Sequence, residues 1–156
     1  MPSQTYGATQ IQKKTGLTKM QVMHLVQTNV IEPKVPAHGR GARRKFSTRN
    51  LIEFLICAEL LKYEVPRVKL LSIIRGLSVP GYELKGQRVD AWEVFANRPQ
   101  KRFLVIVPDP GQAADGYLTN WTYGIVDKRE MASFLRDGGA TSALMIDVRA
   151  LIDSVE

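Results

Sequence analysis

Apolar residues recur every three or four positions along the first half of the chain, which predicts a series of amphipathic helices. A short helix is expected to begin after a Thr9 cap and to end at the Thr15–Gly16 turn. A second helix begins at Thr18. Its expected buried stripe consists of Val22, Leu25 and Val26. Two short helices joined by a tight turn that contains glycine predict a helix-turn-helix.

A basic segment, defined here as residues 38–45, separates these helices from the next pair. Pro33 and Pro36 end the first pair, and the segment follows with the sequence His-Gly-Arg-Gly-Ala-Arg-Arg-Lys. Phe46 comes directly after it as an aromatic anchor. This order makes the segment a candidate wing.

Two longer helices are expected after the basic segment. Ser47 or Thr48 caps the third helix, and Val65-Pro66 starts the fourth, because proline suits a first helical turn. The apolar side of the third helix consists of Leu51, Ile52, Leu55, Ile56, Ala58 and Leu61. The apolar face of the fourth consists of Val68, Leu70, Leu71, Ile73, Ile74 and Leu77.

The second half of the chain follows a different pattern, in which short apolar runs alternate with turn residues. The runs at 103–107, 117–126 and 143–146 predict three strands, with Gly124 as a candidate bulge. Capping residues predict two helices, one headed by Asp127-Lys-Arg-Glu130 and one headed by Asp147. We therefore predict the α+β class, with an N-terminal domain over 1–79 and a small α+β domain over 80–156.

Charge is distributed unevenly between the two halves. Residues 1–80 carry thirteen Lys and Arg against four Glu, a net charge of +9, whereas the remainder has a net charge of −2. Duplex DNA carries about one negative charge per 1.7 Å of axis, so a module with this charge gains affinity by releasing counterions. The N-terminal domain is therefore expected to bind a polyanion.

Several classes of protein are not expected. The longest apolar run, Leu51–Leu61, is far shorter than the roughly 20 residues of a membrane span, and the N-terminus lacks an export signal, so we expect a cytoplasmic protein. Cys57 lies among apolar residues and is interpreted as core. His24 and His38 fit no zinc spacing, and the scattered Asp residues fit turns and caps. We expect no enzyme activity, no metal and no cofactor.

Four pieces of sequence occur in an ordered series over residues 6–77: Gly16-Leu17-Thr18, Val30-Ile31-Glu32-Pro33, Gly39 to Ser47, and a third helix followed by Tyr63-Glu-Val-Pro66. With this series the first half of the chain resembles the MerR family of winged-helix transcriptional regulators. The resemblance implies a dimer that docks a helix in the major groove and a basic wing on the flanking backbone.

The expected DNA contacts lie on three parts of the N-terminal domain. The second helix would supply Thr18, Lys19, Met20, Met23, His24 and Gln27. The wing would supply Arg40, Arg43, Arg44 and Lys45. The resemblance adds a backbone contact at the junction of the third and fourth helices, from Tyr63, Arg67 and Lys69.

Three departures from the family pattern stand out. Met23-His24 replaces an Arg-Tyr pair and so removes a charged DNA contact. Asn29 stands where the family has Gly, a mild change because Asn tolerates left-handed backbone. Pro80-Gly81 is incompatible with the family's long dimerisation helix, so dimerisation is assigned to the second domain.

The resulting hypothesis is a sequence-specific transcriptional regulator that binds double-stranded DNA as a homodimer in the nucleoid. Its second domain would serve dimerisation or sensing. RNA polymerase or another protein remains a candidate partner. A small-molecule effector remains a candidate as well, although no residue pattern supports it. Two alternatives remain: an architectural or phage-type accessory factor, such as an excisionase-like protein, and a module that binds an acidic protein.

Overall fold

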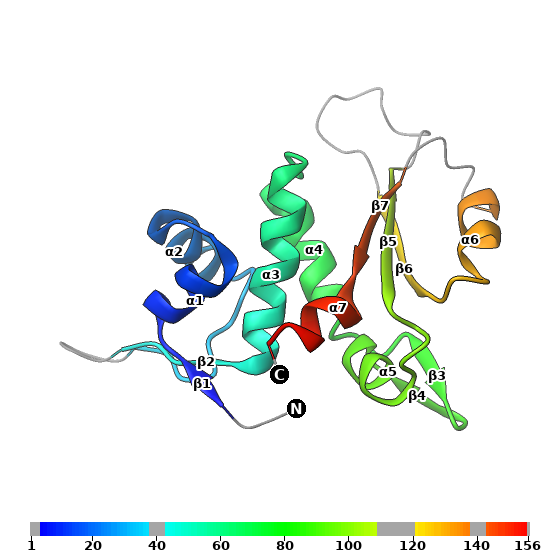
Figure 1. Ribbon diagram of the computed structural model, residues 1–156, viewed down its shortest axis with the longest axis horizontal. Coiled ribbons are helices and arrows are strands. Elements are labelled where there is room, and N and C mark those ends of the chain that lie inside the picture. The colour runs from blue at the N-terminus through cyan, green and yellow to red at the C-terminus, as the bar shows by residue number, and fades with distance from the viewer. Residues whose placement is uncertain (1–3, 38–42, 109–120, 138–142, 156) are drawn as a thin grey trace. The chain divides into compact units, whose positions relative to one another are not determined.

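The computed structural model describes residues 4–37, 43–108, 121–137 and 143–155 of the chain (Figure 1). The chain forms two compact units, one of residues 1–76 with 151–156 and one of residues 77–150. The last six residues thus belong with the N-terminal unit. The sequence-based division at residue 79 had assigned them to the second domain. Helices dominate the first unit and an antiparallel sheet organises the second, so the class is α+β.

The first unit begins with a short strand and two short helices (Figure 1). Its elements are β1 (Thr5–Tyr6), α1 (Ala8–Thr15), α2 (Lys19–Gln27), β2 (Phe46–Ser47), α3 (Thr48–Lys62) and α4 (Arg67–Gly76). Gly16 ends α1 with a φ of 72°, a left-handed conformation that glycine adopts without strain. The predicted tight turn between the first two helices is therefore confirmed.

The caps of α1 and α2 differ in how well the sequence predicted them. The second helix was expected to begin at Thr18, and Thr18 is its N-cap, because the Thr18 hydroxyl accepts the backbone N–H of Gln21 at 3.1 Å. The Thr9 cap was wrong, since Gly7 is the N-cap of α1 and Thr9 lies inside the helix. Gln10 explains the earlier start, because its side chain accepts the Gly7 N–H at 2.8 Å and stabilises that turn.

The core of the first unit surrounds α3. Of the two expected caps, Ser47 and Thr48, Ser47 is the one that caps this helix, and its hydroxyl accepts the Asn50 N–H at 3.1 Å. Leu51, Ile52, Ile56 and Ala58 are buried as expected, but Leu55 and Leu61 are only half-buried. Phe54, Cys57 and Leu60 are fully buried as well, so α3 is enclosed around most of its circumference rather than on one side.

Two short strands tie the N-terminus to the far end of the basic segment. β1 pairs with β2 in antiparallel register, Tyr6 opposite Phe46. Both side chains are 1% exposed, and the Phe46 ring meets the Phe54 ring edge-on at 5.2 Å. The aromatic anchor predicted at residue 46 thus sits in the core, while the two-residue strand β1 escaped prediction because it is too short to show alternation.

Helix α4 buries Leu70, Ile73 and Ile74, but Val68 is 59% exposed, so its assignment to the apolar face was wrong. Val65, just before the helix, is buried. Asn29 adopts a φ of 55°, as expected of a residue that tolerates left-handed backbone.

The second unit is built on a three-stranded antiparallel sheet in the order β6-β5-β7. Its elements are β3 (Tyr82–Leu84), β4 (Gln87–Val89), α5 (Ala91–Asn97), β5 (Phe103–Pro108), β6 (Trp121–Val126), α6 (Met131–Asp137), β7 (Leu144–Asp147) and α7 (Val148–Asp153), the last of which crosses into the first unit. All three predicted strands are present, although residues 117–120 and the Gly138-Gly139 helix end lie outside the described part.

Both faces of the central strand β5 are buried. Phe103, Val105 and Val107 pack with α6 on one face, and Leu104 and Ile106 are buried on the other. The bulge predicted at Gly124 was wrong, because Gly124 pairs in regular register with Val105. A Cβ at Gly124 would lie 2.5 Å from Cε2 of Phe134, so the glycine makes room for that ring.

A hairpin and a helix in the second unit were not predicted. β3 pairs with β4 through the two-residue turn Lys85-Gly86, whose φ values of 51° and 77° match a type I′ turn. Asp90 then caps α5 by accepting the Glu93 N–H at 3.0 Å. The side chains of Trp92 and Phe95 are buried and meet edge-on. The Lys-Gly dipeptide and the Asp90/Glu93 spacing were the available signals.

The helices of the described residues include none with the length and apolar character needed to cross a membrane.

Candidate nucleic-acid interface

Helix α2 has a buried side and an exposed side. Val22, Leu25 and Val26 are buried, as their spacing predicted. The exposed positions are Thr18, Lys19, Met20 and Gln27. Met23 and His24 lie between the two sides and are half-buried. The Thr18 cap, joined by the Gln21 side chain that accepts the Thr18 N–H at 2.8 Å, holds the first turn of α2 in a fixed conformation.

Backbone hydrogen bonds join Lys45, the last residue of the basic segment, to the chain that precedes the segment. Val35 and Lys45 form an antiparallel bridge in which each N–H donates to the other's carbonyl oxygen at 3.0 Å. Beyond the bridge, Phe46 enters β2 and the core. The base of the predicted wing is therefore anchored, while its tip, including Arg40, lies outside the described residues.

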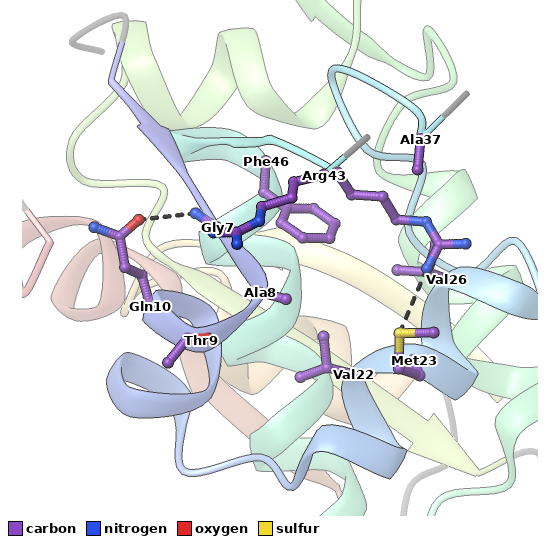
Figure 2. A pocket seen from close by; sticks show the side chains of 11 residues that line it. Gly7, Ala8, Thr9, Gln10, Val22, Met23, Val26, Ala37, Arg43 and Phe46 are labelled. Atoms are coloured by element: carbon purple, nitrogen blue, oxygen red, sulfur yellow. Dashed lines mark hydrogen bonds between the residues drawn. The ribbon is translucent and has the colours of Figure 1, made fainter. Parts of the chain in front are cut away.

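Arg44 extends from this base to α2. Its Nη1 lies 3.4 Å from the Sδ of Met23, close enough for a hydrogen bond to sulfur (Figure 2). Arg43 and Lys45 are exposed, whereas Arg44 is half-buried. Met23 therefore supports an arginine that comes from the basic segment, instead of projecting freely from the helix.

A cleft of about 590 Å³ lies between the basic segment and the first two helices. Figure 2 shows the residues around it, which come from the start of α1, from α2 and from the chain on both sides of residues 38–42. Its lining consists of Gly7, Ala8, Thr9, Gln10, Val22, Met23, Val26, Ala37, Arg43, Arg44 and Phe46. The β1–β2 pairing is what brings the start of α1 to this place. Sequence reasoning missed the α1 residues, because that pairing joins positions about forty residues apart.

Arg67 reaches α2 from the other direction. Its Nη1 lies 2.6 Å from Nε2 of His24. Because a guanidinium can only donate, His24 accepts through Nε2. Arg67 is the first residue of α4, so this contact joins the start of that helix to α2. The sequence analysis placed His24 on the second helix and Arg67 at the α3–α4 junction, as separate groups of expected DNA contacts. The structure brings these two residues into contact.

The other residues expected at this junction are accessible to different extents. Tyr63 is 64% exposed at the C-cap of α3. Lys69 is half-buried on α4. Neither has a described contact with α2, so their grouping with the α2 residues stays a prediction.

A buried polar network lies at the start of α3, the helix that follows Phe46 and β2. The Asn50 Nδ2 donates to the Glu32 carbonyl at 3.0 Å and to the Glu53 carboxylate at 2.9 Å. Burial raises the pKa of Glu53, against the opposing effects of the Asn50 hydrogen bond and the nearby Arg49. Asn50 therefore ties the chain after α2 to the first turns of α3.

Burial raises the pKa of the Cys57 thiol, so this cysteine is an inert part of the core, as interpreted from the sequence. Among the described residues, no group of three or more His, Cys, Asp or Glu side chains is placed to hold a metal ion.

Taken together, the α2 surface is polar, cationic and flanked by two arginines. Lys19 lies on its first turn, Arg44 lies beside Met23, and Arg67 lies beside His24. A surface of this kind can hold a polyanion by charge-assisted hydrogen bonds. No model of a known protein family matches the chain, and a search of curated proteins finds no significant match either.

Proposed function

We propose that this protein is a DNA-binding transcriptional regulator whose N-terminal unit is a MerR-like winged helix. In this proposal α2 enters the major groove, and the basic segment and Arg67 contact the flanking phosphates. The second unit, 77–150, would serve dimerisation or sensing, and the protein would work in the cytoplasm on the nucleoid.

The observation that carries the proposal is the pair of arginines beside α2. Arg44 lies 3.4 Å from Met23 and Arg67 lies 2.6 Å from His24. The family that the first half resembles has an Arg-Tyr pair at these two helix positions. Here Arg44 and Arg67 come from neighbouring elements, so the surface stays positively charged although Met23-His24 lacks the arginine of the family's helix.

A salt titration of duplex binding tests the proposal. About six phosphate contacts predict a slope of log K against log salt near −5, from about −0.9 per contact. R43A/R44A should flatten the slope by up to about two units, because both guanidiniums leave the base of the basic segment.

The matched control removes the same charge from the second unit. R88A/R136A alters two exposed arginines outside the proposed interface and should leave the slope unchanged. An unchanged slope in R43A/R44A, or an equal loss in both variants, would contradict the assignment of the basic segment. A preference of roughly 10³ or more for a selected site over random duplex separates a regulator from an architectural factor.

A further inference from the structure

Met20 is the most exposed large apolar side chain among the described residues, at 81% of its full accessible area. It lies in the first turn of α2, next to the exposed Thr18 and Lys19. Burial in the core accounts for Val22, Leu25 and Val26 on the same helix, but it does not account for Met20. A long apolar side chain held in water at the start of a capped helix is available to a partner.

The neighbouring candidates on α2 are already engaged. Met23 contacts Arg44, and His24 accepts a hydrogen bond from Arg67. Gln27, at the other end of the helix, is polar. Met20 is therefore the residue of the exposed α2 face that offers an apolar terminus to a partner.

Charge decides what kind of partner fits. Lys19 adjoins Met20 in sequence, and Arg44 and Arg67 hold cations beside the next turn of α2. The cations on this surface favour a polyanion as partner. The apolar Met20 side chain further favours a polyanion that carries an apolar group of its own. In the major groove of DNA that group is the 5-methyl of thymine. Helix-turn-helix proteins bring the N-terminal residues of the second helix to the base edges, which is where Met20 lies.

We propose that Met20 is a specificity-determining residue that reads the 5-methyl group of a thymine in each half-site. This inference rests on the proposed DNA-binding function and narrows it to a base that the site must contain. The flexible thioether side chain can follow the methyl group without a hydrogen bond, so recognition depends on apolar contact alone.

Uracil substitution tests the proposal, because uracil pairs as thymine does and lacks only the methyl group. A duplex recovered by selection from random DNA is prepared with thymine or with uracil throughout. Each is titrated with the full-length wild-type protein, with M20A and with the control M145A. Ala is a strong helix former, so M20A keeps α2 folded, and Met145 is a second exposed methionine that lies on β7.

The wild type should bind the thymine duplex roughly fourfold more tightly per half-site, the effect expected for one buried methyl group. M20A should bind both duplexes alike, and M145A should keep the wild-type ratio. Equal binding of both duplexes by the wild type, or an undiminished ratio in M20A, overturns the role of Met20 and leaves DNA binding intact. Failure to bind any duplex in a salt-dependent way overturns the proposed function and this inference together.

Discussion

Single residues in this protein are constrained by neighbours that are distant in sequence. Gly124 is an example: its backbone is regular, and it is glycine because the Phe134 ring lies where a Cβ would be. Asp147 is another, since it both caps α7 and pairs with Arg102. Each leads to a measurable effect on stability.

Gly124→Ala should lower the free energy of unfolding by about 1–3 kcal/mol, the usual cost of overpacking a core. The added Cβ would meet Cε2 of Phe134 at 2.5 Å, so the ring and α6 must shift. Denaturant unfolding measures the change. G81A is the control, because the nearest atom to its Cβ lies at 3.8 Å. Equal stability of the two variants would show that the ring moves aside freely.

Asp147 should make stability depend on pH in the acidic range. Burial opposes its ionisation, but hydrogen bonds from Arg102 and from the Ala150 N–H outweigh this and hold the pKa of Asp147 below its ordinary value. A lowered folded-state pKa stabilises the protein at pH values above the unfolded-state pKa of about 3.9, and this contribution is lost as pH falls through the lower folded-state pKa.

The wild type should therefore be more stable than D147N at neutral pH, by up to about 1 kcal/mol for a partly exposed pair. The difference should shrink as pH drops below about 4. Unfolding measured at a series of pH values gives the curve. Asn can still cap α7, whereas D147A loses the cap as well and should be less stable than D147N at every pH. A D147N difference that does not vary with pH would refute the assignment to the Arg102 pair.

At the scale of elements, short segments are held by contacts at their ends. The Val35–Lys45 bridge joins the last residue of the basic segment to the chain before the segment, and Asn50 hydrogen-bonds that preceding chain at the Glu32 carbonyl. α2 is supported from two directions, by Arg44 and by Arg67. The proposed interface is thus an assembly of three elements rather than a property of one helix.

Asn50→Ala should destabilise the protein by about 1–3 kcal/mol. The Asn50 amide donates a hydrogen bond to the Glu32 carbonyl and another to the buried Glu53 carboxylate, and the substitution removes both. Thermal or denaturant unfolding measures the loss. The control is N97A, which removes an exposed amide that bonds only a neighbouring helical carbonyl, and its effect should be within about 0.5 kcal/mol. Comparable effects in both variants would mean that the Asn50 network adds little.

At the scale of the whole molecule, the change from a basic to a slightly acidic chain near residue 80 lies close to the boundary between the two units at residue 77. The basic residues gather in the first half of the chain, and the sheet unit of 77–150 follows with a different architecture. In the proposed function the first unit supplies the DNA contacts, and the second supplies dimerisation or sensing.

The molar mass of a homodimer in solution should be twice the 17.5 kDa of the chain. The sites that it selects from random duplex should be inverted repeats, with half-site centres about 34 Å apart or a multiple of that. Analytical ultracentrifugation and site selection measure these two properties. A monomer that selects asymmetric sites would argue against paired winged helices and in favour of an accessory DNA-binding factor.

The sequence by itself determined the features that depend on a few neighbouring residues. The start of α2 at Thr18, the caps at Ser47 and Asp147 and the left-handed Asn29 could be predicted, because each depends on hydrogen bonds or backbone preferences within about four residues. The candidate interface was predicted to the same extent, as a list of cationic and polar positions on α2 and the basic segment.

Only the tertiary structure decided which of these positions meet. The β1–β2 pairing, the sheet order β6-β5-β7, the reach of Arg44 and Arg67 to α2, and the place of Gly124 beneath Phe134 all join residues well separated in the chain. Local periodicity shows which side of an element is buried. The partner of that side depends on how the whole core packs, which is a property of all the elements together.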